Sequence, residues 1–346
     1  MSKKREAELS DNREYILRQA ANRFGVAVDQ LTKLHDSMKI DQSRTFIEKS
    51  LYEYKRGGKS FILRLTVPEY VDFEFIKGEV DWTNYLADND VHVPRVIPSQ
   101  RGKLVEVIEA EDSSLAAVAF EKVKGRRIDF GNAGEWNTKL FERYGKTMGR
   151  IHALTKRYEP EDRSLSRMEW HEQEWFDIDA HLPGSESLAR KKCHDLIRMT
   201  HTLPRDTSSY GLIHGDAHPW NLLVHKGDLI VTDFDFCEYN WFVSDTAVAL
   251  FYALMAPIEG MDKVSFARCF MENFIRGYKK ENSIEGYWMK QIPTFLRLRM
   301  VSKYLLHYQE WRSNNMSEVR RAAFIEWKHK IQNDIPYVDI DFSEFS

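Results

Sequence analysis

The 346-residue sequence is poor in cysteine, in long apolar runs and in net charge. Its three cysteines, Cys193, Cys237 and Cys269, are odd in number and widely spaced, which argues against a disulfide framework or a zinc site. The longest apolar run, residues 247–258, is too short to span a bilayer, and the N-terminus lacks the apolar core of a signal peptide. These absences favour a cytoplasmic location and predict no membrane partner.

The chain also lacks a large excess of either charge. Its formal net charge is −3, and no long block of like charge occurs. This balance gives no reason to expect a nucleic-acid partner. The chain also contains no Walker A motif, so a P-loop nucleotide site is not expected. Its length leaves room for one large domain or two modest ones with a sizeable core.

Most of the chemistry in the chain lies between residues 210 and 245, YGLIHGDAHPWNLLVHKGDLIVTDFDFCEYNWFVSD. Asp216 follows a short apolar run and a His-Gly pair, and Asn221 comes five residues later. Two further apolar runs on either side of Gly227 predict a β-hairpin in which glycine supplies the positive φ of the turn. If the strands pair symmetrically about Gly227, Asn221 lies opposite Asp233, and cross-strand neighbours are about 5 Å apart.

The side chains at these positions are those that hold a hard cation. An amide oxygen (Asn221) and a carboxylate (Asp233) at that distance, with a second carboxylate (Asp216) on the preceding loop, suit Mg²⁺ bridging a polyphosphate. The spacing therefore indicates a metal and phosphate site on the hairpin.

The succession HGDAHPWNLL, VTDFDF and SDTA resembles the catalytic loop of the aminoglycoside phosphotransferase and choline kinase superfamily. It is similar, too, to type II homoserine kinases and bacterial stress-response Ser/Thr kinases. The resemblance implies an α+β, protein-kinase-like bilobal fold. It assigns residues 1–118 to a small antiparallel-sheet lobe, 119–125 to a hinge, and 126–346 to a larger, mostly helical lobe that carries the catalytic hairpin and the acceptor site.

The same resemblance assigns roles around the hairpin. Asp216 would accept a hydrogen bond from the acceptor hydroxyl and take its proton late. Asn221 and Asp233 would hold Mg²⁺. His214 completes the catalytic group, where we expect it to brace the loop, and Asp245 would tie the loop backbone down.

In the N-terminal part, residues 11–24 show helical spacing, and strands are expected at 45–54 and 60–66 around a Gly-Gly turn. Arg64 lies in the middle of the second strand, either exposed on an edge strand or paired in the interior. The resemblance implies that Arg64 contacts the α- and β-phosphates of ATP and pairs with Glu79 of a helix at 71–89, with Glu74 as a weaker alternative.

The chain departs from the protein-kinase pattern because no glycine lies between Val26 and Arg56, where a glycine-rich phosphate loop would be. Phosphate contacts there would fall to the backbone and hydroxyl groups of Ser43, Arg44 and Thr45. After strands at 104–108 and 116–120, the order of elements places the adenine edge against the hinge backbone near Glu121 and Val123.

The later segments bear on the acceptor. Residues 168–182 mix tryptophan with carboxylates, either as an acidic helix with an aromatic core side or as a substrate wall for an amine. An acceptor with a positive charge would meet the carboxylates and aromatic rings near the hairpin, namely Asp235, Glu238, Trp220, Tyr239 and Trp241. His152 is expected to be a packed residue. The helix at 295–311 carries Arg297, Arg299 and Lys303, either as a solvated face or as a site for a substrate carboxylate.

These features predict an ATP-dependent, Mg²⁺-assisted phosphotransferase acting on a hydroxyl of a small molecule, such as an amino alcohol, a hydroxy amino acid or an aminoglycoside. One alternative is a bacterial Ser/Thr protein kinase. Another is a non-catalytic nucleotide-binding or structural protein that retains the fold. A homodimer is compatible with the sequence, which does not identify the acceptor.

Overall fold

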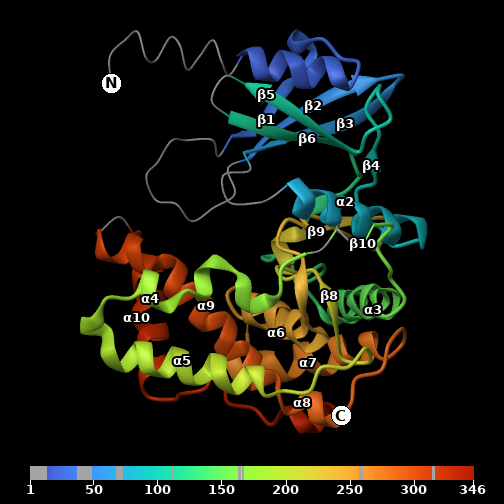
Figure 1. Ribbon diagram of the computed structural model, residues 1–346. Coiled ribbons are helices and arrows are strands. Elements are labelled where there is room, and N and C mark those ends of the chain that lie inside the picture. The colour runs from blue at the N-terminus through green and yellow to red at the C-terminus, as the bar shows by residue number, and fades with distance from the viewer. Residues whose placement is uncertain are drawn as a thin grey trace. The chain divides into compact units, whose positions relative to one another are not determined.

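The computed structural model describes residues 14–36, 49–67, 73–110, 113–162, 165, 167–256, 260–313 and 316–346. The chain forms two compact units, Met1–Lys124 with Glu159–Ser166, and Gly125–Tyr158 with Arg167–Ser346. The boundary after Lys124 falls inside the segment 119–125 that the sequence assigns to a hinge, and the hinge role stays a prediction. Figure 1 shows the elements of both units.

The first unit is built on an antiparallel sheet in the order β1-β2-β3-β6-β4, with β5 also paired to β6. A helix over residues 14–23 and helix α2 (Phe73–Asp88) accompany the sheet. The strands are β1 (Thr32–Asp36), β2 (Lys49–Arg56), β3 (Lys59–Thr66), β4 (Val96–Ile97), β5 (Val105–Ala110) and β6 (Ser113–Glu121). The predicted hairpin, helix and strands of this part are therefore present, with shifted ends.

The two faces of this sheet pack against different helices. Successive side chains of a strand point to opposite faces, so each face has its own apolar cluster. Phe61, Leu63 and Leu65 of β3 share a buried cluster with Ile16, Ala20 and Phe24. On the other face, Ile76 and Val80 of α2 pack with Val105, Ala116 and Val118. Figure 1 shows the first helix in blue on one side of the sheet and α2 on the other.

The second unit is mostly helical. Two short strand pairs, β8 with β11 and β9 with β10, carry its polar loops, and β7 (Arg126–Arg127) adds to β9. The other strands are β8 (Tyr210–Ile213), β9 (Leu222–His225), β10 (Asp228–Val231) and β11 (Glu238–Trp241). The helices are α3 (Thr138–Thr155), α4 (Ile178–His181), α5 (Ser187–His201), α6 (Phe242–Ala253), α7 (Lys263–Tyr278), α8 (Gly286–Met289), α9 (Ile292–Arg312) and α10 (Glu318–Gln332), followed by the 3₁₀ turn η6 (Phe342–Phe345).

Helices α3 and α7 approach each other closely through glycine. A Cβ atom on Gly145 would lie 1.8 Å from the carbonyl oxygen of Phe274, and one on Gly277 would lie 1.8 Å from that of Glu142. Any side chain at either position would push the helices apart. This contact fixes α3, which carries Tyr144 and His152 to the catalytic loop.

The register of the β9–β10 hairpin differs from the predicted one. Val231 pairs with Leu222 and Asp228 with His225, so the turn contains two residues, Lys226 (φ 50°) and Gly227 (φ 94°), instead of three. Two positive φ angles are typical of the tight turn that matches strand twist. Asn221 therefore lies opposite Thr232. The backbone N–H of Thr232 donates to the carbonyl oxygen of Asn221 at 2.9 Å. The prediction that Asn221 faces Asp233 was wrong by one residue.

The segment 168–182 is not the single helix that its composition suggested. It breaks into two 3₁₀ turns, Trp170–Glu172 and Glu174–Phe176, and the short α4. Gln173 is extended (ψ 131°), and the Asp177 side chain caps α4 by accepting from the N–H of Ala180. Each interruption ends a run of helical hydrogen bonds.

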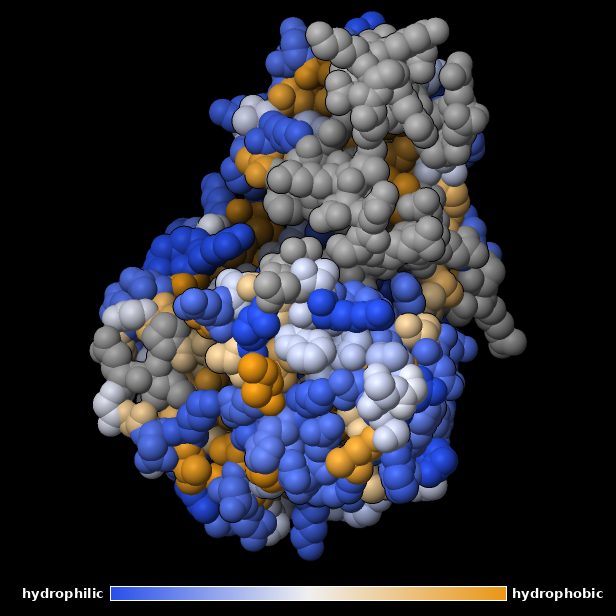
Figure 2. All heavy atoms as spheres, turned by 90° about the vertical axis from the view of Figure 1, so that its left-hand side faces the viewer, coloured by the Kyte–Doolittle hydropathy of each residue, from blue (hydrophilic) through white to orange (hydrophobic). Residues whose placement is uncertain are grey.

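The face shown in Figure 2 is mainly hydrophilic over its lower, helical part, with apolar side chains appearing singly or in small groups. Scattered apolar side chains are normal on a protein surface. In the portion of the chain that the structure describes, none of the helices has both the length and the apolar character needed to cross a bilayer.

Candidate active site

The catalytic loop begins where β8 ends. Gly215 has a φ of 73°, and a Cβ atom there would lie 2.2 Å from the carbonyl oxygen of Phe236, so glycine is required on both grounds. The tight turn directs the backbone from β8 into Asp216. Tyr144 of α3 donates from its hydroxyl to the carbonyl oxygen of Ala217, which holds the next residue of the loop.

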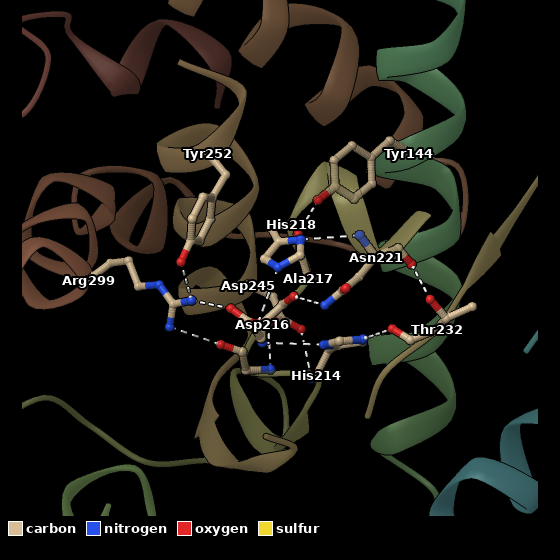
Figure 3. A network of polar contacts seen from close by, with 11 residues as sticks. Tyr144, His214, Asp216, Ala217, His218, Asn221, Thr232, Asp245, Tyr252 and Arg299 are labelled. Carbon is tan, nitrogen blue, oxygen red and sulfur yellow. Dashed lines mark hydrogen bonds and ion pairs between the residues drawn. The ribbon is translucent and has the colours of Figure 1, made fainter. Parts of the chain in front are cut away.

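Asp245 of α6 anchors this turn (Figure 3). Its carboxylate accepts the backbone N–H groups of His214 and Gly215, each at 2.9 Å, and also contacts Nε2 of His152 at 3.2 Å. Asp245 and His152 are fully buried. His152 is thus a packed residue, as expected, and Asp245 fixes the loop backbone.

His214 is buried and its imidazole lies between two backbone groups. Nε2 is 3.1 Å from the carbonyl oxygen of Thr232, and Nδ1 accepts the N–H of Asp216 at 3.3 Å. The backbone donor at Nδ1 places the ring proton on Nε2. In this arrangement the imidazole braces the loop against β10.

Asp216 is paired with a cation from the C-terminal part of the chain. Oδ1 accepts from the guanidinium of Arg299 on α9, and Oδ2 lies 3.4 Å from Nε2 of His218. Burial by itself would raise the pKa of the Asp216 carboxyl, but Arg299 opposes it most strongly, with His218 and Lys303 adding to the effect, and the pKa falls to about 2. The side chain is therefore an ionised carboxylate near neutral pH.

His218 is a neutral neighbour of that carboxylate. Burial lowers the pKa of His218 to about 4 although Asp216 acts in the opposite direction. Its Nδ1 accepts the backbone N–H of Asn221 at 3.1 Å, so the proton on Nε2 points toward Asp216. Because His218 is uncharged at neutral pH, we take Arg299 as the cation that keeps Asp216 ionised.

The pairing of Arg299 with Asp216, the predicted catalytic carboxylate, was not foreseen from the sequence. A second contact, from its guanidinium to the hydroxyl oxygen of Tyr252 at 2.9 Å, holds it in place. The sequence left Arg297, Arg299 and Lys303 as a solvated face or a carboxylate site, whereas Arg297 pairs with Asp334 and Arg299 with Asp216. The available signal was a cation within a largely apolar helix, since Leu298 and Met300 on either side are buried.

The predicted metal ligands follow the loop. The side-chain amide of Asn221 donates to the carbonyl oxygen of Asp216 at 3.0 Å, so its oxygen is the atom left for a cation. Asp233 is exposed and has a φ of 68° just after β10. Among the residues that the structure describes, no group of three or more His, Cys, Asp or Glu side chains is arranged for a metal. The two oxygen donors nevertheless fit Mg²⁺, which is bound through one or two carboxylates together with phosphate oxygens and waters.

Glu238 begins β11 and its carboxyl group is buried. Gln173 donates to one of its oxygens at 2.9 Å and Asn240 to the other at 2.8 Å. Burial raises the pKa of Glu238 to about 7, because these neutral amides and the more distant Arg299 offset only part of the desolvation. The carboxyl is therefore close to changing its charge at neutral pH.

The other residues predicted to contact the acceptor differ in their exposure to solvent. Trp241 is fully buried, with its indole N–H bonded to the carbonyl oxygen of Pro204, so its assignment as a substrate contact was wrong and it belongs to the core. Trp220 is 38% exposed and contacts the rings of Phe130, His218 and Tyr252. Tyr239 is half-buried, and Asp235 is buried.

In the first unit, Arg64 and Glu79 form the pair that the resemblance implied. The two guanidinium nitrogens of Arg64 each donate to one oxygen of Glu79 at 2.8 Å, and both side chains are buried. The guanidinium also lies 5.1 Å from the ring centroid of Phe120. The alternative of an exposed arginine on an edge strand is excluded, since β3 lies between β2 and β6.

Two other predictions for the first unit concern the adenine contact near Glu121 and Val123 and the phosphate contacts of residues 43–45. The backbone N–H of Glu121 donates to the carbonyl oxygen of Arg95 at 2.8 Å, so the adenine contact expected there could use only its carbonyl group. Val123 is half-buried. Ser43, Arg44 and Thr45 lie outside the described residues, and their phosphate contacts stay a prediction.

The chain is similar to known proteins over most of its length. The family model described as "Phosphotransferase enzyme family" matches residues 48–278. Amicoumacin kinase of Bacillus subtilis (strain 168) is 31% identical over 332 residues, which cover 95% of each chain.

Solved structures give the same picture. Amicoumacin kinase hAmiN, in complex with AMP-PNP, Ca²⁺ and Ami, is 30% identical, with a TM-score of 0.88 over 98% of this chain and 99% of that one. The microcompartment-associated aminopropanol kinase is 21% identical, with a TM-score of 0.68 over 92% of this chain and 95% of that one, and shows the fold alone. The predicted α+β, protein-kinase-like fold is thereby confirmed.

Proposed function

Because the chain belongs to the phosphotransferase enzyme family, we propose that it transfers the γ-phosphoryl group of ATP to a hydroxyl of amicoumacin or of a compound similar to it. The predicted enzyme class, a small-molecule kinase, is confirmed by the similarity over nearly the whole length to amicoumacin kinase. The identity of the acceptor is the part that we propose.

The observation that carries this function is the position of Asp216. Its carboxylate is ionised, and its backbone is held on both sides, by Asp245 before it and by the amide of Asn221 at its own carbonyl oxygen. A carboxylate with a pKa near 2 is a weak base, so its main contribution is to orient the acceptor hydroxyl by accepting its hydrogen bond. Phosphoryl transfer depends on such positioning and on charge stabilisation more than on base strength.

The reaction follows from that geometry. The acceptor oxygen forms a bond to the γ-phosphorus as the bond from phosphorus to the β,γ-bridging oxygen breaks, and ADP carries away the electron pair. The hydroxyl proton passes late to a carboxylate oxygen of Asp216. Two products result, ADP and a phosphate monoester.

The resemblance names candidate residues for the nucleotide phosphates and their metal. Asn221 and Asp233 supply oxygen donors for Mg²⁺, which when bound would neutralise phosphate charge. Arg64, fixed by Glu79, would contact the nucleotide phosphates, a role that suits the planar guanidinium. The solved hAmiN complex contains AMP-PNP and Ca²⁺, which supports a nucleotide and a divalent cation here.

The acceptor would bring a positive charge near its hydroxyl. Of the residues expected to meet it, Asp235 and Glu238 are carboxyl groups and Trp220 is a partly exposed aromatic ring. A carboxyl with a pKa near 7, such as Glu238, becomes fully ionised when an ammonium group binds beside it. Binding of an amine at Glu238 would then release a proton.

The test is direct phosphorylation of amicoumacin. The full chain is incubated with ATP, Mg²⁺ and amicoumacin, and mass spectrometry should detect a product heavier by one phosphoryl group. Asp233→Asn should abolish this transfer while the circular dichroism spectrum is unchanged, and Asp228→Asn, at the exposed start of β10 in the same hairpin, should leave it intact. Undiminished transfer by Asp233→Asn, or no product with the native chain, would refute the proposal.

A further inference from the structure

Helix α9 carries a second cation beside Arg299 that the proposed reaction leaves without a role. Lys303 follows Arg299 by one helical turn, so both side chains lie on the same face. The Nζ atom of Lys303 is 5.6 Å from the ring centroid of Tyr252, and Cζ of Arg299 is 5.1 Å from the same centroid. Tyr252 therefore has two cations against its ring.

Arg299 has a counter-charge, but Lys303 has none within the described residues. Arg299 is paired with Asp216, whereas the half-buried Lys303 has no carboxylate or hydrogen-bond partner in the part of the chain that the structure describes. Its charge is close enough to Asp216 to lower the pKa of that carboxyl. A partly desolvated ammonium without a counter-ion favours the binding of an anion.

The other neighbours of Asp216 do not remove this excess. The ring of His218 accepts the backbone N–H of Asn221 at Nδ1, so it carries one proton and no charge. One carboxylate, Asp216, thus faces two cations, Arg299 and Lys303. Asp216, Arg299 and Lys303 together therefore carry one positive charge in excess.

We propose that Lys303, together with Arg299 and the ring of Tyr252, forms an oxyanion site next to Asp216. The oxyanion is either the phosphoryl group as it reaches the acceptor hydroxyl or a carboxylate of the acceptor itself. This inference rests on the proposed function, because it takes Asp216 as the residue that receives the hydroxyl. A compact ammonium with three rotatable donors suits a group whose charge is spread over several oxygens.

The same geometry restricts the acceptor amine. Because Tyr252 already faces two cations of the protein, an ammonium group of the acceptor would be repelled there. It would go instead to Glu238 or to the partly exposed ring of Trp220. An acceptor with an amine and an acidic group would satisfy both ends of the site.

The site can be tested without turnover. Inorganic phosphate is titrated calorimetrically into the full chain and into Lys303→Met, Lys303→Arg and Lys290→Met, the last of which removes an exposed charge just before the same helix. We expect Lys303→Met to bind phosphate about tenfold more weakly, and Lys303→Arg and Lys290→Met to resemble the native chain. Equal phosphate affinity of Lys303→Met and the native chain would overturn the proposal.

Kinetics with amicoumacin then distinguish the two sources of the oxyanion. If the site holds the phosphoryl group, Lys303→Met lowers kcat and leaves the KM for amicoumacin unchanged. If it holds an acidic group of the acceptor, the KM rises and kcat is retained. Should native protein form no product, the proposed function fails, whereas the phosphate titration still decides the oxyanion site.

Discussion

Asp216, which is half-buried, and Glu238, which is buried, are two carboxyl groups of the same unit whose environments drive their pKa values apart. Asp216 follows β8 and Glu238 begins β11, and these two strands pair with each other. The pKa of Asp216 falls to about 2 and that of Glu238 rises to about 7. Desolvation acts on both in the same direction, so the difference comes from the partners.

The difference between the two pKa values comes from a cation that contacts one carboxyl group and not the other. Asp216 has the guanidinium of Arg299, while Glu238 has only the neutral amides of Gln173 and Asn240. A fixed positive charge keeps a buried carboxylate ionised, and two amide donors do not. The first carboxyl is therefore suited to hold a hydroxyl in one protonation state, and the second to respond to a charged ligand.

The largest expected effect comes from making the surroundings of Asp216 resemble those of Glu238. Arg299→Met leaves Asp216 as a largely desolvated charge without a cation in contact, and we expect the free energy of unfolding to fall by about 3 to 5 kcal/mol. Arg297→Met is the matched control, because it removes the cation of a solvent-exposed pair on the same helix and should cost at most about 1 kcal/mol.

Chemical denaturation at neutral pH measures both changes. If Arg299→Met does not fold, Asp216→Asn combined with Arg299→Met should recover a large part of the lost stability, because the unpaired charge is gone. Equal losses for Arg299→Met and Arg297→Met would contradict the distinction between buried and exposed pairs.

The second prediction removes the other carboxyl. Glu238 keeps its proton up to a pKa of about 7 in the folded chain but ionises near its ordinary 4.5 when unfolded. Its contribution to stability is therefore complete below about pH 4.5 and is lost as the pH rises toward 7, a change of about 3 kcal/mol. Glu238→Gln should lack this loss.

Unfolding in denaturant at pH 5, 6, 7 and 8 follows the effect. Glu272→Gln, which changes an exposed carboxyl of the same unit, serves as the control and should keep the pH dependence of the native chain. A native-like fall in stability for Glu238→Gln would place the titrating group elsewhere.

A smaller effect is expected at the fully buried Asp245, whose carboxylate oxygens accept backbone N–H groups. Asp245→Asn retains one side-chain oxygen, so either His214 or Gly215 loses its acceptor. Leaving one buried donor unsatisfied should cost about 1 to 3 kcal/mol. Denaturation compared with Asp341→Asn, an exposed cap of the last 3₁₀ turn, measures it, and indistinguishable stabilities would show that the loop is held by other contacts.

The parts of the site that the sequence predicted are those fixed by local chain geometry. The spacing of Asp216, Asn221 and Asp245 identifies the loop because a short strand and a glycine turn leave little freedom between them. Arg64 and Glu79 could be paired because a charge in an apolar strand requires a neighbour. Both inferences needed only a few residues of context and the resemblance.

The remaining features depend on contacts that the linear sequence does not specify. Arg299 lies 83 residues from Asp216, and helical periodicity shows that it is near the core without indicating its partner. The prediction of the hairpin register failed because two-residue and three-residue turns around Gly227 have similar sequences. Trp241 was misassigned because proximity to a motif does not reveal which side of a strand faces the interior.

The account depends most directly on Asp216 as the residue that positions the acceptor hydroxyl. The decisive measurement is the steady-state rate of phosphoryl transfer from ATP to amicoumacin by Asp216→Asn, with amicoumacin binding followed separately by calorimetry. We predict that kcat falls by about 10² to 10⁴ while the affinity for amicoumacin stays within a few-fold of the native value. A variant that binds amicoumacin and transfers phosphate at the native rate would contradict the account.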